Sequence, residues 1–355
     1  MNSVLRRGGA LVLAVGLGAC KPPEPPVLAP APEGPAAIAP ARQVASNDDD
    51  AAHRPIDDAP APAPGTLVDA DAAPAVVSVA LDHAGEVLIG KDFGLFSRSN
   101  IFLDELLAGF GNPSDTLGLV DGKGVSFGNI GTGYPYPFPT SQITYRNNNL
   151  LPGLRIAVGI LDPIDSNQID KDASDGLDDK AYQDNPRYES EVSYQFDLAG
   201  AQVYSWINGG YQTSKNTSDS VDSVTSKGVG YGLQVKMGGF SVTGSGFTAK
   251  GINPFFTNNA GEAALREVDS RGALLQGSYS WGKNRLALSY GKTVDDGNGL
   301  GSAADYESRG IAYFRTINDN LKLVAELNRY RIDGRDGAAL DEDTDTVALG
   351  AVLNW

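Results

Sequence analysis

Hydrophobic and polar residues alternate along most of the chain from residue 76 onward. The clearest case is the segment 154–161, in which every second residue is a large aliphatic: Leu154, Ile156, Val158 and Ile160. The positions between them are small or basic: Arg155, Ala157 and Gly159. Because successive side chains of a β-strand point to opposite faces, this period of two predicts a strand with one apolar face.

Twelve segments carry this pattern and are predicted as strands. They are 86–91, 142–147, 154–161, 188–198, 201–212, 228–237, 240–250, 272–282, 284–293, 307–317, 320–332 and 344–355, with a possible thirteenth at 76–82. Short connections such as 198–201 alternate with long ones such as 162–187. This alternation is typical of outer-membrane barrels, so the sequence predicts an all-β fold, an antiparallel transmembrane β-barrel of about 12 strands (12–14).

The last predicted strand gives the strongest sign of a lipid-facing surface. One of its faces is apolar throughout: Val347, Leu349, Ala351, Leu353 and Trp355. Aromatic residues also end other apolar faces, at Tyr145, Trp281 and Tyr290. A soluble β-sandwich alternates too, but aromatic residues at the ends of apolar faces favour a barrel in lipid. The segments 201–211 and 311–315 fit either parity poorly.

The N-terminus predicts export and a lipid anchor. Arg6 and Arg7 precede a short apolar run at 10–17, too short to span a bilayer, so residues 1–19 are predicted as a signal peptide. The run ends in Leu-Gly-Ala before Cys20, the only cysteine, which is similar to the lipobox of bacterial lipoproteins. Lys21 then favours the outer membrane by the sorting pattern of such proteins. The alternative is an ordinary signal peptide with a chance cysteine.

Residues 20–75 are rich in Pro, Ala and Asp and are predicted to form a disordered tether, because they cannot bury enough apolar area to offset their ordering entropy. The predicted barrel domain is 76–355. The net charge of −16 excludes a nucleic-acid partner, since phosphates require Lys and Arg. Acidic residues are concentrated at 162–179. This segment contains an incomplete calcium-loop pattern, but its composition favours an acidic outer loop over a calcium site.

Enzyme chemistry is not expected. The two histidines are His53 in the tether and His83 before the first well-defined strand, so a barrel-wall Ser–His pair cannot form. The sequence offers neither a Cys/His metal set nor a phosphate-binding loop, and we expect no catalytic residue, cofactor or metal.

Several segments in order resemble the Gram-negative general-diffusion porins. They are 90–96, 141–146, 153–159, 186–194 and 321–328, with Gly350, Leu353 and Trp355 similar to the family's C-terminal assembly signal. Ala348 departs from that signal, where a polar residue is usual. The resemblance covers about residues 84–355 and implies a place in the cell outer membrane of a Gram-negative bacterium, contact with its lipid, and a trimeric homo-oligomer.

The resemblance also implies a loop that folds into the barrel and narrows the pore. The segment 94–138 occupies its place, with a short helix expected at 101–107. The candidate constriction residues are the loop acids Asp104 and Glu105 and the wall bases Arg146 and Arg155. Acids facing bases across a lumen would set charge selectivity. In the alternative interpretation, Asp104 and Glu105 lie on a solvated helical turn.

About four strands of such a porin are missing at the front of the chain. The barrel could close with about twelve strands, be completed by a second barrel or partner, or be a truncated product. An even count places both ends in the periplasm, whereas thirteen strands place the tether outside the cell; the tether could also thread the lumen.

The expected function is passive diffusion of small hydrophilic solutes with mild cation preference, because lumen and loops are acid-rich. The alternatives are a non-conducting, lipid-anchored β-domain that binds a ligand or partner, and a partial barrel completed by another chain.

Overall fold

The computed structural model describes residues 8–13, 75–81, 84–107, 128–163, 181–182, 185–216, 223–252, 257, 269–297, 303–335 and 341–353. Its strands are β1 (Gly8–Leu13), β2 (Ala75–Leu81), β3 (Gly85–Phe93), β4 (Pro139–Asn147), β5 (Leu154–Leu161), β6 (Ala181–Tyr182), β7 (Arg187–Leu198), β8 (Ala201–Asn216), β9 (Ser223–Met237), β10 (Phe240–Lys250), β11 (Asp269–Trp281), β12 (Asn284–Asp295), β13 (Ala304–Thr316), β14 (Leu321–Gly334) and β15 (Asp341–Leu353). The helix α1 spans Arg98–Leu103. The predicted all-β fold is confirmed, including the possible thirteenth strand, which is β2.

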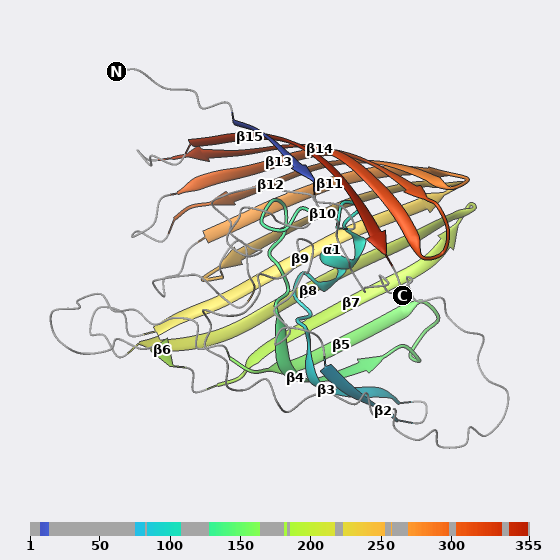
Figure 1. Ribbon diagram of the computed structural model, residues 1–355. Coiled ribbons are helices and arrows are strands. Elements are labelled where there is room, and N and C mark those ends of the chain that lie inside the picture. Colours follow the sequence, from blue (N-terminus) through green and yellow to red (C-terminus); the bar gives the residue numbers. More distant parts are fainter. Residues whose placement is uncertain are drawn as a thin grey trace, which may run out of the picture.

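The strands form one sheet in which chain neighbours pair antiparallel from β2 to β15, with the short β6 beside β8. Short turns join strands at one end of the sheet, for example Leu198 to Ala201 and Met237 to Phe240. The longer connections lie at the opposite end, so we call the two ends the short-turn end and the long-loop end. Figure 1 shows the sheet curling from β2 to β15 around α1.

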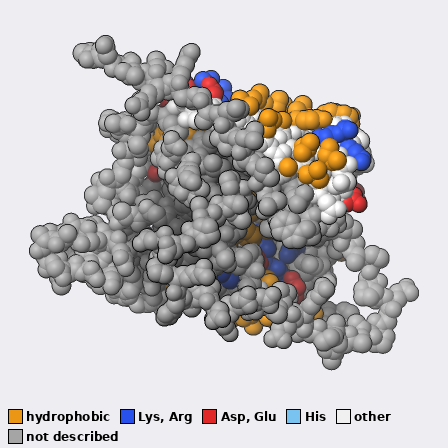
Figure 2. All heavy atoms as spheres, in the orientation of Figure 1, with side chains coloured by type: hydrophobic (Ala, Val, Ile, Leu, Met, Phe, Trp, Pro, Cys, Tyr) orange, Lys and Arg blue, Asp and Glu red, His pale blue; other side chains and the backbone are white. Residues whose placement is uncertain are grey.

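Alternation along the strands separates an outer face from an interior face. In β15, Val347 and Leu349 are exposed while Thr346 and Ala348 are buried, which confirms the predicted parity of these residues. Other large exposed apolar residues, such as Ile160, Leu288 and Leu327, share the outer face. Figure 2 shows hydrophobic side chains gathered over β13 and β14, and charged side chains inside a central recess. None of the described helical sequence is long and apolar enough to cross a bilayer.

The sheet is not closed among the described residues. β2 pairs with β3, and β15 pairs with β14 and β1. The sequence left open whether the strand at 86–91 would meet the last strand; β3 pairs with β2 and β4 instead. β1 falls within the predicted signal peptide and runs parallel to β15, with Gly8 opposite Thr344.

The two ends of the antiparallel series have the same direction. Thirteen strands run from β2 to β15 when the short β6 is left out, and an odd number leaves the first and last strands parallel to each other. β2 therefore begins at the long-loop end, and β15 finishes at the short-turn end.

Candidate functional site

The chain after β3 crosses the interior of the sheet before it reaches β4 (Figure 1). The described parts of this inserted segment are residues 94–107, which contain α1, and residues 128–138. The structure therefore places the described parts of the expected inward loop, 94–107 and 128–138, against the interior face. The expected helix at 101–107 lies earlier, at Arg98–Leu103.

A buried carboxylate of β7 fixes the start of the inserted segment. Glu189 accepts hydrogen bonds from the backbone N–H groups of Leu95 (2.5 Å) and Phe96 (2.9 Å). Its other carboxylate oxygen lies 3.0 Å from Nε of Arg187. Hydrogen bonds to a charged acceptor are roughly twice as strong as neutral ones, so Glu189 is a strong anchor for this turn.

Two residues further along β7, Glu191 holds α1. The Ser99 hydroxyl donates to a carboxylate oxygen of Glu191 at 2.8 Å, and the Ser99 backbone N–H donates to the same oxygen at 3.2 Å. Asn208 of β8 donates a third hydrogen bond to it at 3.1 Å. At the next residue, the Asn100 amide donates to the Ser245 hydroxyl of β10 at 2.8 Å. The helix is thereby tied directly to β7 and β10.

Asp104 is the central acceptor of the inserted segment. One of its oxygens accepts hydrogen bonds from the Leu106 N–H (3.0 Å), the Asn129 amide (2.9 Å) and the Gln276 amide (2.7 Å). The other accepts from the Asn129 N–H (2.5 Å) and the Tyr134 hydroxyl (2.7 Å). Burial, and next the Asp104 charge, raise the pKa of Tyr134 well above its ordinary value, so its hydroxyl stays protonated and donates.

The position of Asp104 corrects the sequence-based expectation. Asp104 was expected to face the pore as a constriction acid, but it is only 7% exposed and its carboxylate accepts five hydrogen bonds. A carboxylate enclosed in this way stabilises the loop and offers no face to a passing solute. It ties together the two described halves of the segment and the wall at β11.

Glu105 points to the wall and meets a base there. Its carboxylate forms an ion pair with Arg285 of β12 and accepts a hydrogen bond from the Ser278 hydroxyl of β11 at 3.0 Å. The Arg285 guanidinium also lies over the ring of Phe314, with 4.0 Å to the ring centroid. An acid on the loop therefore faces a base on the wall, as expected, but its partner is Arg285, which the sequence did not single out.

Arg146 is engaged near the start of the inserted segment. Its Nη2 lies 2.8 Å from the Asp92 carboxylate, which also lies 3.2 Å from Arg98 of α1. Glu86 is a further partner at 3.8 Å. The expected pairing of Arg146 with the loop acids Asp104 and Glu105 is not present. Arg146 pairs instead with Asp92, the second-last residue of β3.

Arg155 lies on the interior parity of β5, opposite Ser193 of β7, as the alternation predicts. Its side chain is half-buried. It forms no ion pair with Asp104 or Glu105.

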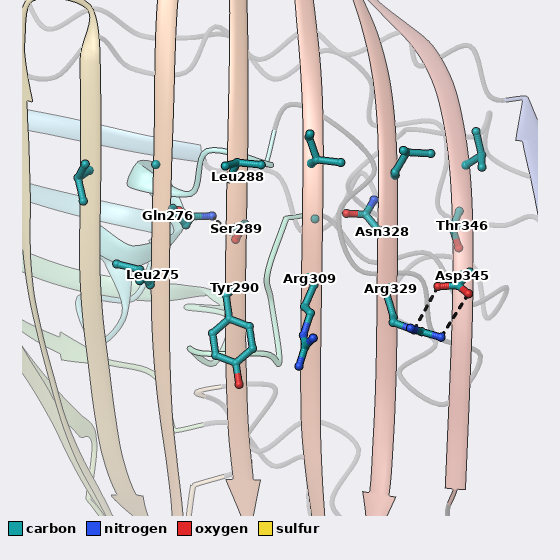
Figure 3. A pocket seen from close by; sticks show the side chains of 16 residues that line it. Leu275, Gln276, Leu288, Ser289, Tyr290, Arg309, Asn328, Arg329, Asp345 and Thr346 are labelled. Carbon is teal, nitrogen blue, oxygen red and sulfur yellow. Dashed lines mark hydrogen bonds and ion pairs between the residues drawn. The ribbon is translucent and has the colours of Figure 1, made fainter.

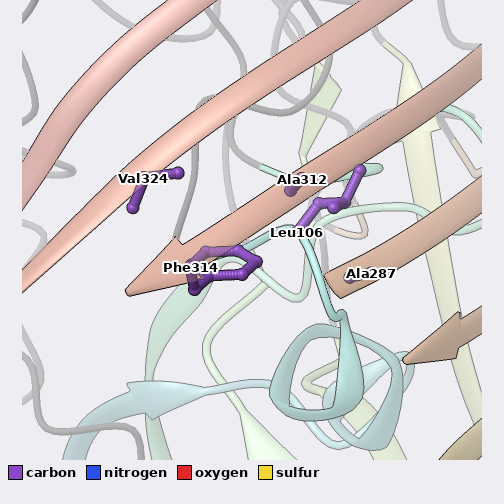
Figure 4. Packing of buried hydrophobic residues seen from close by; sticks show 5 residues of the cluster. All are labelled: Leu106, Ala287, Ala312, Phe314 and Val324. Carbon is purple, nitrogen blue, oxygen red and sulfur yellow. The ribbon is translucent and has the colours of Figure 1, made fainter. Parts of the chain in front are cut away.

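The returning half of the segment lies against β11 to β13. The Thr132 and Ser308 hydroxyls are 2.7 Å apart, and the Gly133 N–H donates to the Thr293 hydroxyl at 2.8 Å. The backbones of the segment and of β12 approach so closely that a Cβ at Gly291 would lie 2.0 Å from the Thr132 carbonyl oxygen. Apolar contacts complete the attachment: Figure 4 shows Leu106 of the segment between residues of β12, β13 and β14, namely Ala287, Ala312, Phe314 and Val324.

Sequence reasoning missed the carboxylates Asp92, Glu189 and Glu191. The signal that could have found them is parity, because all three lie on the interior face of their strands, where buried and exposed residues alternate. What the sequence could not show is that the partners of Glu189 and Glu191 come from a segment about ninety residues away.

Other predicted residues lie partly outside this arrangement. Gly350 and Leu353 of the expected assembly signal are in β15, opposite Val324 and Leu321 of β14. Trp355, the lipidation candidate Cys20, the tether after Cys20 up to residue 74 and the acidic stretch at 164–179 lie outside the described residues.

On the outer face, a shallow groove of about 1130 Å³ crosses β10 to β15. Its apolar side contains Leu275 and Leu288, and its charged side contains Arg309 and Arg329 (Figure 3). Nε of Arg329 lies 3.2 Å from the Asp345 carboxylate. The groove therefore marks the boundary between an apolar band and a belt of ion pairs nearer the long-loop end.

Comparisons with known proteins agree with this geometry. The family model described as Gram-negative porin matches residues 63–335. The outer membrane channel DcaP of Acinetobacter baumannii is similar in structure, with a TM-score of 0.53, 14% identity and coverage of 76% of this chain and 71% of that one. The anion-selective porin from Comamonas acidovorans gives a TM-score of 0.47, 14% identity and coverage of 79% and 74%. No curated protein sequence matches the chain significantly.

Proposed function

The chain belongs to the Gram-negative porin family, and from this premise we propose that it is a channel for passive diffusion of small hydrophilic solutes across the outer membrane. The family and the similar outer-membrane channel support a diffusion channel in the outer membrane of a Gram-negative bacterium. The observation that carries the proposal is the inserted segment. It is fixed across the interior of the sheet by Glu189, Glu191, Asp104 and Glu105, as a constriction requires.

The proposal predicts stepwise ion conductance. Purified full-length protein reconstituted in planar bilayers is expected to give discrete single-channel currents in KCl, because water and ions fill an interior lined with polar groups. Vesicle swelling in small sugars gives a second readout. Heat-modifiable, folded protein that conducts nothing in either assay would overturn the proposed function.

We further propose that the channel mildly prefers cations. The interior acids that the structure describes are largely engaged in holding the inserted segment, so the acid-rich connections at the long-loop end carry this proposal, among them Asp162, Asp165 and Asp170. Acidic groups around a pore mouth concentrate cations locally.

We propose that Cys20 is lipidated and anchors the chain. The supporting observation is the Leu-Gly-Ala-Cys sequence after a short apolar run. Replacing Cys20 with serine is expected to abolish incorporation of labelled palmitate in cells, while the matched substitution Ser46→Ala in the tether leaves it unchanged. Labelling that persists in Cys20→Ser would contradict the anchor.

We propose a homo-oligomer, a trimer by family resemblance. The belt of ion pairs on the outer face of β13 to β15 supports it, with Arg309 beside Glu307 at 2.6 Å and Arg331 beside Asp343 at 3.4 Å. Such charges are costly against hydrocarbon and suit a headgroup layer or a protein neighbour.

The open sheet favours a second candidate, a partial barrel completed by another chain. Unpaired edge groups cannot remain in hydrocarbon, and the edges of β2 and β15 are not paired with each other in the described sheet. Co-purification with a second barrel, together with conductance only in its presence, would favour this candidate over an independent channel.

A further inference from the structure

The acids on the interior face are paired at close range. Asp92, Glu105 and Glu189 each meet a guanidinium: Arg146, Arg285 and Arg187 respectively. Asp104 and Glu191 are enclosed by hydrogen-bond donors of the inserted segment and the wall. A carboxylate that is paired in this way contributes little to the electric field in the open part of the lumen.

Three bases on the same interior face lie near the short-turn end. Arg155 is the second residue of β5, Lys236 the second-last of β9 and Lys322 the second of β14. All three are half-buried side chains of interior parity. In the part of the chain that the structure describes, none of the three has a hydrogen-bond or ion-pair partner.

The remaining charges at this end do not cancel these three. Arg285 is close enough to Lys322 for their charges to interact, but it is already matched by Glu105. The interior wall acids at this level are Asp197, second-last in β7 and exposed, and Glu86, second in β3, which lies 3.8 Å from Arg146. Because Arg146 matches Glu86, three unmatched bases face one unmatched acid, and the short-turn end of the lumen is positive.

We infer that this end of the lumen is an anion-attracting vestibule, formed by Arg155, Lys236 and Lys322, which sets the permeability of small carboxylates and other anions. The inference rests on the proposed channel function and adds a specificity-determining set to it. The connections between strands at the long-loop end are acid-rich in sequence, so we expect the two mouths to carry opposite charge. When the two ends of the lumen carry opposite charge, channels inserted in one orientation pass unequal currents at positive and negative voltages of the same size.

The test is the triple substitution Arg155→Gln, Lys236→Gln and Lys322→Gln in the full chain. Removing the bases is expected to raise the potassium-to-chloride permeability ratio about two- to fivefold and to change the asymmetry of the current–voltage curve. Uptake of succinate into vesicles, relative to an uncharged sugar of similar size, is expected to fall by a similar factor.

The control is Lys283→Gln with Arg315→Gln, which removes two bases at the same end but outside the lumen. Lys283 is in a turn and Arg315 is on the outer face of β13. Equal permeability ratios in the triple variant and in the control would overturn the inference while leaving conductance, and so the proposed function, intact. If the triple variant does not fold, Lys236→Gln alone is expected to shift the ratio in the same direction, and no shift would overturn the inference.

Discussion

Replacing Asp104 with alanine is expected to release the inserted segment from the wall and to enlarge the pore. The substitution leaves five donors without their acceptor, including the Gln276 amide on β11 and the Tyr134 hydroxyl. Hydrogen bonds to charged groups contribute about 1.5–3 kcal/mol each, so even partial loss amounts to about 3–5 kcal/mol. The barrel wall keeps its own strand pairing, so the effect concentrates on the segment.

Single-channel conductance and limited proteolysis measure this release. We expect a conductance increase of about twofold or more and new cleavage within 94–138, while the folded protein still shifts in heat-modified electrophoresis. Tyr134→Phe removes one of the five bonds and is expected to have a smaller effect of the same kind. Asp345→Ala, an exposed acid on the outer face, serves as the control. Unchanged conductance and protease resistance in Asp104→Ala would show that other contacts hold the segment.

The strands were predictable because each of them separates two environments. In β5 and β15 the outer residues face one medium and the interior residues another, so the period of two survives in the sequence. The segments 201–211 and 311–315 lack a clear period of two because each carries a large apolar residue on its interior face. Trp206 and Phe314 are apolar yet lie on the interior face, where Trp206 is buried and Phe314 packs against Leu106 of the inserted segment.

The candidate site was predictable only in part. The loop and the interior parity of Arg146 and Arg155 follow from local sequence and resemblance. The role of Asp104 does not, because its donors Asn129 and Gln276 are 25 and 172 residues away and only the fold brings them together. An isolated acid in a sequence gives no indication whether it faces solute or is enclosed by donors.

The outer face provides the sharpest distinction between a membrane channel and a soluble β-domain. Replacing Leu288 with arginine is expected to destabilise the protein in bilayers by about 2–4 kcal/mol, the cost of a charge near the middle of the hydrocarbon layer. Leu288 is exposed in the middle of β12, opposite Ile311 of β13. On the surface of a soluble domain, the same substitution would change stability by less than about 0.5 kcal/mol.

Depth dependence supplies the control for this prediction. Leu198 is as exposed as Leu288 but ends β7 at a short turn, where a charge costs about 0–1 kcal/mol because it can reach the headgroups. Urea titration of both arginine variants, folded into lipid vesicles, gives the two free energies of unfolding. A large loss at Leu288 with a small one at Leu198 places the outer face of β12 in lipid. Small and equal effects at both positions would mean that hydrocarbon does not cover this face, and a non-conducting β-domain would then become the better account of the chain.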